Sequence, residues 1–477
     1  MFESSGPFAL FDHFRVPYRL VNASPPSQAV TATDSSATLC WPDSQLLARE
    51  GHPPDLYFLR SVPLPGSVLD DVQARELLRS RGDDWEPVDA VTDRNGSLVG
   101  SVWRASDGSA FLPFDPNAVI SALWTERYVE FGSIARTGRL ASLVRSGYYK
   151  VRPLIPRAAQ IGLRRWFSRV QGRRRFPRWP IEPGLDDLLR FLFDVVTDVA
   201  GREVPFIAPW PKPWSWALVL THDVERAVGY ANLHRLLDVE LELGYRSSCN
   251  FVPCNGYVVE RSLLHRLREE GFEVGVHGLR HDGRDVSPST FSRRLPAIRA
   301  YADHWEAVGF RSPGTLRSAR LMPLLGFDYD SSFSDTAPFE PQAGGCCTWL
   351  PYFLEDTVEL PITIVQDHTL FDLMQHRDET VWTDKATFLR DRGGMALVLT
   401  HPDYVANPYL VDSYRRFLET FAADTSAWHA LPREVSAWWR RRQESTLEEV
   451  DGEWVVAGPA EFEAQIGFTV PTSRVPA

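Results

Sequence analysis

The sequence has few cysteines, no long apolar run and no basic signal-like start, and each absence excludes a class of protein. Five cysteines among 477 residues are too few, and odd in number, for a disulfide framework, so free thiols in a reducing compartment are expected. No apolar run approaches the roughly 20 residues that a membrane-spanning helix needs. The first residues lack the basic stretch and apolar core of a signal peptide. A cytoplasmic protein without a transmembrane segment is therefore predicted.

Charge and composition narrow the class further. The formal net charge is −11, whereas a general nucleic-acid binder has an excess of basic residues, so no nucleic-acid partner is expected. Hydrophobic residues make up 44% and charged residues 24% of the chain, a balance typical of globular proteins. The length exceeds that of one ordinary core and predicts two or three domains.

The N-terminal region, residues 1–145, is predicted to be an α+β accessory domain. Short apolar stretches alternate there with turn pairs such as Asn95-Gly96, which are typical of hairpins. Residues 115–131 have the composition of a helix, and Asp115 is suited to cap its start.

A basic segment follows this region. Residues 151–180 contain nine arginines and no acidic residue. Such a segment either binds an anionic ligand or membrane surface or is a solvated linker, and its aromatic residues favour a linker that docks on a neighbour. Residues 146–213 are predicted to be this linker and a helix that starts near residue 185, and residues 436–477 are predicted to be a C-terminal extension.

From residue 214 onwards, strand-like runs that end in polar residues alternate with helical stretches. This order predicts a parallel α/β sheet or barrel over residues 214–435. Chemistry in such folds gathers at the carboxyl ends of the strands. The runs are WALVL (216–220), FEVGVH (272–277), GFRSPG (309–314), ELPITI (359–364) and MALVLTH (395–401).

The first strand ends in a histidine and two carboxylates. Residues i and i+2 of an extended segment share a face, so Asp223 and Glu225 should point together and His222 to the other side. Two neighbouring carboxylates repel one another and need a cation, which is either an arginine or a metal ion. His222 is expected either to be packed in the core or to contact the site residues without binding the metal itself.

The second strand leads into HGLRH, in which His277 and His281 are four residues apart. Histidines at this spacing can converge on one metal. The alternative is that they are two unrelated surface histidines. Two imidazoles and one carboxylate form an open catalytic zinc arrangement with a place left for water.

Two further strand ends carry catalytic residue types. Arg311, in GFRSPG, can orient a carboxylate by a bidentate contact. His401, in LVLTH, can act as a general acid, since a histidine ordinarily titrates near pH ~6.5. A metal-assisted hydrolase needs metal ligands, a base, an arginine that orients the base, and an acid. Candidates for all of these occur in one α/β unit.

With these motifs in this order, residues 214–435 resemble the polysaccharide deacetylases, the NodB-like carbohydrate esterases of family four. The resemblance implies a distorted β/α barrel with a metal held by Asp-His-His. HGLRH is similar to the family's metal motif, which implies that His277 and His281 are ligands. RSPG is similar to the Arg-x-Pro motif, which implies that Arg311 orients the base. LVLTH is similar to the last motif, which implies that His401 protonates the leaving amine.

The first motif departs from the family pattern, Thr-Phe-Asp-Asp-Gly, in which the first Asp is the base and the second binds the metal. Val224 stands here at the ligand position and cannot bind a metal. Asp223 matches the base, and Glu225, on the same face, is the candidate ligand. An exchange of these two roles stays open.

The resemblance implies a metal-dependent hydrolase that removes an N-acetyl group from an amino sugar in a polysaccharide or glycan precursor. Two nitrogen ligands and one oxygen ligand suit Zn²⁺, and Co²⁺, Mn²⁺, Fe²⁺ or Ni²⁺ also fit. Two alternatives stay open: a non-catalytic carbohydrate-binding protein on the same fold, and a metal amidohydrolase that acts on a non-sugar C–N bond.

Residues near the remaining strand ends have two interpretations each. The aromatic residues Trp349, Tyr352 and Phe353 either stack on sugar rings or belong to the core. Gln366, Asp367 and His368 either line the pocket or cap a turn.

Overall fold

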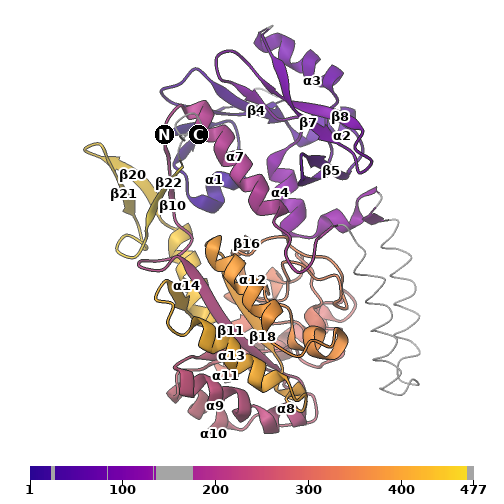
Figure 1. Ribbon diagram of the computed structural model, residues 1–477, viewed down its shortest axis with the longest axis vertical. Coiled ribbons are helices and arrows are strands. Elements are labelled where there is room, and N and C mark those ends of the chain that lie inside the picture. Colours follow the sequence, from indigo (N-terminus) through magenta and orange to yellow (C-terminus); the bar gives the residue numbers. More distant parts are fainter. Residues whose placement is uncertain (23–26, 83, 133, 136–175, 470–477) are drawn as a thin grey trace. The chain divides into compact units, whose positions relative to one another are not determined.

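The computed structural model describes residues 1–22, 27–82, 84–132, 134–135 and 176–469, which group into two compact units (Figure 1). The first unit holds the described residues of 1–153, 183–208 and 441–477, and the second holds those of 154–182 and 209–440. The domain boundaries predicted from the sequence stay a prediction. Most of the arginine-rich segment 151–180 lies outside the described residues.

The first unit is α+β and is built on a mixed sheet in the order β2-β1-β3-β4-β9-β8-β7-β5-β6. The hairpin predicted at Asn95-Gly96 is confirmed, because β7 and β8 pair antiparallel around it. The Asp93 carboxylate accepts the N–H groups of Asn95 and Ser97, and Gly96 has a φ of 84°. The strands are β1 Phe2–Ser4, β2 Tyr18–Leu20, β3 Ser27–Ala32, β4 Thr38–Pro42, β5 Asp55–Leu59, β6 Val62–Gly66, β7 Glu86–Thr92, β8 Leu98–Arg104 and β9 Ala110–Phe111.

The helix predicted over 115–131 is shorter in the structure. Asp115 caps it as expected, because its carboxylate accepts the N–H groups of Asn117 and Ala118. The helix ends at Trp124, since Glu126 adopts a left-handed φ of 56° and a separate 3₁₀ turn follows. The described helices of this unit are α1 Ala9–Phe14, α2 Ser44–Glu50, α3 Asp71–Leu78, α4 Pro116–Trp124 and α7 Gly184–Ala200.

The end of the chain joins this unit through short strands. β10 Val204–Ile207 pairs antiparallel with β22 Ile466–Thr469, and β20 Thr446–Val450 pairs with β21 Glu453–Ala457. The buried Arg442 guanidinium donates to the carbonyl oxygens of His13, Ala208 and Ile207. One side chain thereby joins three segments that are far apart in the sequence.

The second unit is the predicted distorted β/α barrel. Strands β18, β11, β12, β13, β14, β15 and β17 are neighbours in this order and run parallel. The strands are β11 Trp216–Val224, β12 Ser247–Phe251, β13 Glu273–Val276, β14 Gly309–Phe310, β15 Tyr329–Asp330, β16 Tyr352–Leu354, β17 Thr357–Glu359, β18 Met395–Thr400 and β19 Ala427–His429.

The barrel closes between β15 and β18 through an extended segment rather than a full strand. Ile362 forms a parallel bridge with Ser334 beyond β15. The N–H groups of Thr363 and Ile364 donate to the carbonyl of Leu397 in β18. This irregular seam is the distortion of the barrel.

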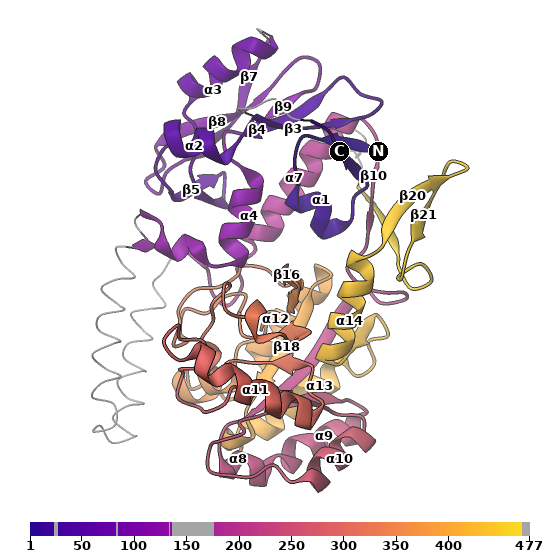
Figure 2. The ribbon, with the colours of Figure 1, turned by 180° about the vertical axis from the view of Figure 1, so that it is seen from behind.

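Helices cover the outside of these strands (Figures 1 and 2). α10 and α11 contact β13, and α12 contacts β18 and β11. All residues of β11 are buried, which is why the strand begins with a continuous apolar run over residues 216–220. The helices are α8 Ala227–Asn232, α9 His234–Leu243, α10 Arg261–Glu269, α11 Phe291–Trp305, α12 Thr380–Asp391, α13 Leu410–Phe421 and α14 Pro432–Gln443.

Two expectations from composition can be compared with the structure. All five cysteines are free thiols, as predicted. No helix in the described part of the chain has the length and apolarity to cross a bilayer.

A buried ion pair ties α12 to the loop after β15 and generates a stability prediction. Lys385 Nζ lies 2.6 Å from Asp335 Oδ2, and both side chains are almost fully buried. Lys385→Met should lower the free energy of unfolding by about 3 kcal/mol, because it leaves a buried carboxylate without its cation. The double variant with Asp335→Asn should recover part of that loss. Urea denaturation measures both, with the exposed Lys212→Met as control, and equal stability of Lys385→Met and wild type would contradict the prediction.

Candidate metal and catalytic site

The inner face of β11 presents the first part of the site. Arg311, which follows β14, donates from Nη1 to Thr221 Oγ1 at 2.8 Å and to Asp223 Oδ1 at 3.3 Å. Since β12 and β13 separate β14 from β11, this side chain crosses the barrel interior. Thr221 and Asp223 therefore point inward, as the two-residue period of a strand requires.

His222 points to the opposite face, as predicted. Its Nδ1 lies 2.7 Å from Thr400 Oγ1, and its Nε2 lies 2.7 Å from Glu240 Oε1. Glu240, on α9, also accepts from Ser247 and Tyr414. His222 is thus part of a buried polar network between the strands and helices, away from Asp223.

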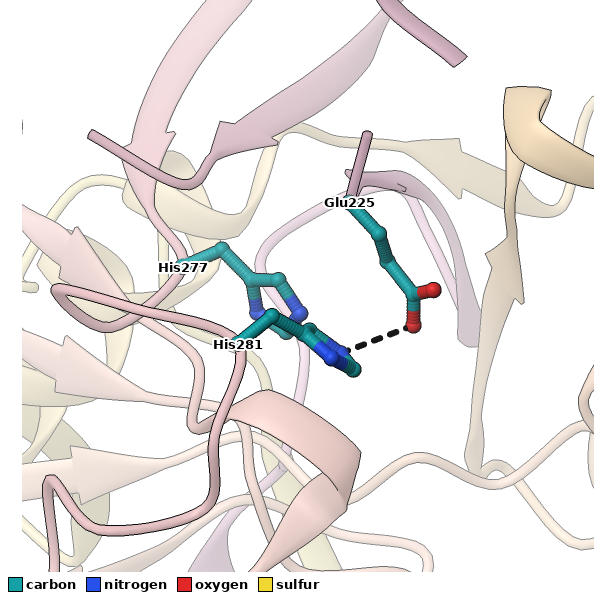
Figure 3. Close-up of side chains that lie close together, drawn as sticks. All are labelled: Glu225, His277 and His281. Atoms are coloured by element: carbon teal, nitrogen blue, oxygen red, sulfur yellow. Dashed lines mark ion pairs between the residues drawn. The ribbon is translucent and has the colours of Figure 1, made fainter. Parts of the chain in front are cut away.

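Glu225, His277 and His281 come together above the strand ends (Figure 3). One ligand atom from each side chain lies within 4.8 Å of the other two. His281 Nε2 is 2.9 Å from Glu225 Oε1, and the two imidazole centroids are 5.5 Å apart. Two nitrogens and one carboxylate oxygen within this distance are suited to a divalent metal.

The hydrogen bonds of the two imidazoles fit a metal ion. His277 Nδ1 is 3.1 Å from the Arg311 carbonyl oxygen, to which it can only donate. Its buried Nε2 is then an acceptor, and it has no hydrogen-bond partner among the described residues. His281 Nε2 likewise makes no hydrogen bond within the described chain, although the Glu225 carboxylate is adjacent. A cation that accepts both nitrogen lone pairs satisfies these orphaned atoms.

The backbone around Glu225 is held by residues that the sequence analysis did not single out. Asp403 Oδ2 accepts the Glu225 N–H at 2.9 Å, and Asn255 donates to the Glu225 carbonyl at 2.6 Å. A Cβ on Gly229 would lie 2.1 Å from Asp403 Oδ2, so glycine is required for this approach. Asp403 follows His401 in HPDY, and this position was its only signal in the sequence.

Asp223 has partners that hold it ionised. Asn250 on β12, opposite Asp223 in the strand register, donates to Asp223 Oδ1 at 2.9 Å. Burial by itself would raise the pKa of Asp223, but His277, Arg311 and Asn250 outweigh it and lower the pKa below its ordinary value. A Cβ on Gly275 would lie 2.0 Å from Asn250 Oδ1, so Gly275 provides the room for this amide.

The pKa values of Glu225 and of its partner His281 shift in opposite directions. Burial raises the pKa of Glu225, but the close contact with His281 and its charge outweigh it and hold the pKa well below its ordinary range. Burial lowers the pKa of His281, but the contact with Glu225 outweighs it and raises that pKa. The pKa of His277 is lowered to about 4, mainly by burial.

His401 forms a close pair with Asp367. Its Nδ1 lies 2.6 Å from Asp367 Oδ1, and its backbone N–H donates to Asp367 Oδ2 at 2.6 Å. Burial opposes protonation, but Asp367 outweighs it and raises the pKa of His401 to about 10. His401 Nε2 points toward the site, 3.9 Å from Glu225 Oε1. Asp367 also accepts the N–H of His368 and so caps the turn that begins there.

The three aromatic residues that were candidates for the rim differ in how deeply they are buried. Trp349 and Tyr352 are buried, whereas Phe353 is half-buried. The Trp349 ring packs edge-on against Phe388 at 5.3 Å. Trp349 and Tyr352 therefore belong to the core.

Comparison with known proteins found matches among solved structures only. No family model and no curated protein match the chain. A putative polysaccharide deacetylase from Mycobacterium smegmatis is 18% identical with a TM-score of 0.39, over 51% of this chain and 96% of its own. PuuE allantoinase is 15% identical with a TM-score of 0.39, over 49% and 93%. A probable polysaccharide deacetylase from Pseudomonas aeruginosa PAO1 is 18% identical with a TM-score of 0.37, over 48% and 92%.

These matches include the family that the motifs resemble. At such identities and scores they carry no information about the substrate or the metal of this chain.

The raised pKa of His281 generates a prediction about metal binding. Protons and a metal ion compete for His281 Nε2, and this competition begins at a higher pH than for an ordinary histidine. The apparent affinity for Zn²⁺ should fall about tenfold for each pH unit below that pKa. Competition with a chelator between about pH 5.5 and 8.5 measures this slope. An affinity that does not change with pH would contradict the role of His281.

Proposed function

We propose that this protein is a divalent-metal-dependent hydrolase that removes the N-acetyl group from an amino sugar of a polysaccharide or glycan precursor. The single observation that carries the proposal is the orphaned Nε2 of buried His277, which converges with His281 and Glu225. Zn²⁺ is the proposed metal, because two imidazoles and one carboxylate match its ligand preference.

Two separate acid–base pairs beside this ligand group support hydrolysis. When bound, the metal would act as a Lewis acid that polarises the acetamide carbonyl and stabilises negative charge on its oxygen. Asp223 takes the proton of the attacking water. Arg311 and Asn250 keep its carboxylate ionised and oriented for this step.

His401 serves the other half of the reaction. Asp367 holds its Nδ1, so Nε2–H is directed into the site. The leaving amine takes this proton as the C–N bond breaks, and acetate and a free amino sugar are released. Since a binding protein has no use for a carboxylate base and a protonated imidazole, these pairs favour an enzyme over the carbohydrate-binding alternative.

The assignment of ligands generates a prediction about metal content. His277→Ala, His281→Ala and Glu225→Ala should each lose most of the bound metal, because an open site has only three protein ligands. Asp223→Asn should keep the metal, since Asp223 is bound to Arg311 and Asn250 instead. Elemental analysis of the purified proteins measures this. Exposed His265→Ala is the matched control, and metal loss in Asp223→Asn with retention in Glu225→Ala would exchange the two roles.

The acid–base assignment generates a prediction about turnover. Asp223→Asn and His401→Ala should each reduce kcat for acetate release by about 10²–10⁴-fold, with metal content and the folded circular-dichroism spectrum retained. The substrates are N-acetylated sugars, nucleotide sugars and glycan oligomers, with a non-sugar N-acetyl amine in parallel. Preference for the non-sugar amide would favour the amidohydrolase alternative, and no acetate from any substrate would contradict hydrolysis.

Asp367→Asn provides a readout that a purely structural role would not change. The acid must be protonated, so activity is lost as pH rises through the pKa of His401. Removal of the Asp367 charge lowers that pKa. The alkaline limb of the pH–rate profile should therefore move to lower pH, and an unchanged limb would contradict the role of His401.

A further inference from the structure

The two histidines of the proposed metal site are held in different ways. The side chain of His277 is 1% exposed, its backbone N–H donates to the Phe251 carbonyl at 2.8 Å, and its Nδ1 donates to the Arg311 carbonyl. The side chain of His281 is 28% exposed, and no described residue hydrogen-bonds to its Nδ1. A metal-binding histidine usually donates this second ring N–H to the protein, which orients the ring. Without that support in the described chain, the position of His281 depends on the backbone that carries it.

The backbone before His281 is fixed by Asp285. The Leu279 N–H donates to Asp285 Oδ2 at 3.0 Å, and the Leu279 carbonyl accepts the Cys254 N–H at 3.1 Å. A Cβ on Gly278, which has a φ of 66°, would lie 2.3 Å from the same carboxylate oxygen. Glycine at this position therefore allows the turn between the two histidines to close around Asp285.

Arg294, on α11, binds this carboxylate and the residue after His281 at the same time. Its Nη1 donates to Asp285 Oδ1 at 2.8 Å. Its Nη1 and Nη2 also donate to the two carboxylate oxygens of Asp282 at 2.7 and 2.6 Å. Asp282 directly follows His281. One guanidinium thus fixes the chain on both sides of His281, and its planar pair of donors matches a carboxylate in a way that a lysine cannot.

The contacts of Arg294 separate this role from direct participation in the site. Within the described chain, its guanidinium forms ion pairs with Asp282 and Asp285 and none with Glu225. The residue is 9% exposed, and α11 packs against β13, the strand that leads into the metal motif. Any effect of Arg294 on the metal therefore has to pass through the loop that it binds.

We propose that Arg294 is a positioning residue: by binding Asp282 and Asp285 it holds His281 where it can bind the metal, and it thereby sets the affinity of the site for a divalent ion. The inference rests on the proposed function for the identity of His281 as a ligand. Because Arg294 acts through the loop, its effect on metal affinity should disappear when the imidazole of His281 is absent.

The first test measures the Zn²⁺ affinity of the full-length protein by competition with a chelator. Arg294→Lys keeps the charge that Asp285 needs but loses the paired donors, and its affinity should fall roughly 10- to 100-fold. The double variant Arg294→Met with Asp285→Asn removes this ion pair without leaving a buried charge, and its affinity should fall by a similar factor. Arg293→Met, at an exposed position of the same helix, is the matched control and should bind Zn²⁺ as wild type does.

A double-variant cycle separates positioning from general destabilisation. In His281→Ala, whose residual affinity is measured at higher Zn²⁺ concentration, Arg294→Lys should cause no further loss. An equal loss with and without His281 would overturn the inference, as would wild-type affinity in Arg294→Lys.

Hydrogen exchange of the metal-free proteins gives a readout that does not depend on the ion. The Leu279 amide should exchange faster in Arg294→Lys than in wild type, because its acceptor Asp285 is held less firmly, while the amides of β13 exchange as before. Unchanged exchange at Leu279 would also overturn the inference.

Acetate release from the same proteins distinguishes the inference from the proposed function. If Arg294→Lys weakens Zn²⁺ binding through His281 but wild type releases no acetate, the inference stands and the hydrolase proposal falls. If wild type releases acetate and Arg294→Lys binds Zn²⁺ equally well, the hydrolase proposal stands and the inference is overturned. If wild type binds neither Zn²⁺, Co²⁺ nor Mn²⁺, His281 is not a ligand and both are overturned.

Discussion

The alternation of side chains along β11 is the constraint on which the rest of the site depends. Thr221 and Asp223 point into the barrel and His222 points out, because successive side chains of a strand face opposite sides. A slip of one residue would bury His222 among the inward-facing polar groups and turn the carboxylates toward the helices. The network of His222, Glu240 and Thr400 on the outer face therefore also fixes the register of the inner face.

Buried carboxylates are costly unless each has a cation or a set of donors. The barrel meets this requirement in different ways for Asp223, which lies in β11, and for Glu225, which follows the strand. Asp223 is held by Arg311 and Asn250, and Glu225 lies against His281. This separation gives the two carboxylates different chemistry although only Val224 stands between them, and it is the physical basis for assigning a base and a ligand.

Close backbone approaches support these side chains. Gly275 leaves space for Asn250, and Gly229 leaves space for Asp403, which holds the Glu225 N–H. Neither glycine takes part in the proposed chemistry. A methyl group at either position would displace a residue that orients a carboxylate, so the site is sensitive to residues that contact neither substrate nor metal.

The sequence by itself determined the barrel, its alternating order of strands and helices, and the strand ends at which polar residues collect. These follow from local periodicity, since runs such as 216–220 and 395–400 need only their own residues to indicate buried strands. The shared face of Asp223 and Glu225 follows from the same two-residue period. The break at Glu126, which ends α4 early, could not be read from composition, because it depends on one left-handed residue.

The tertiary structure decided which residues meet. Three residues that orient site groups, Asn250, Asp367 and Asp403, lie far in sequence from those groups. Nothing in the local sequence distinguishes them, because their contacts form only when the strand ends of the folded barrel lie side by side. The same holds for a small pocket in the barrel unit, whose walls come from segments near residues 179, 335, 366 and 385. Periodicity encodes which side chains share a face, whereas contacts across the barrel depend on how its strands are ordered and where its seam closes.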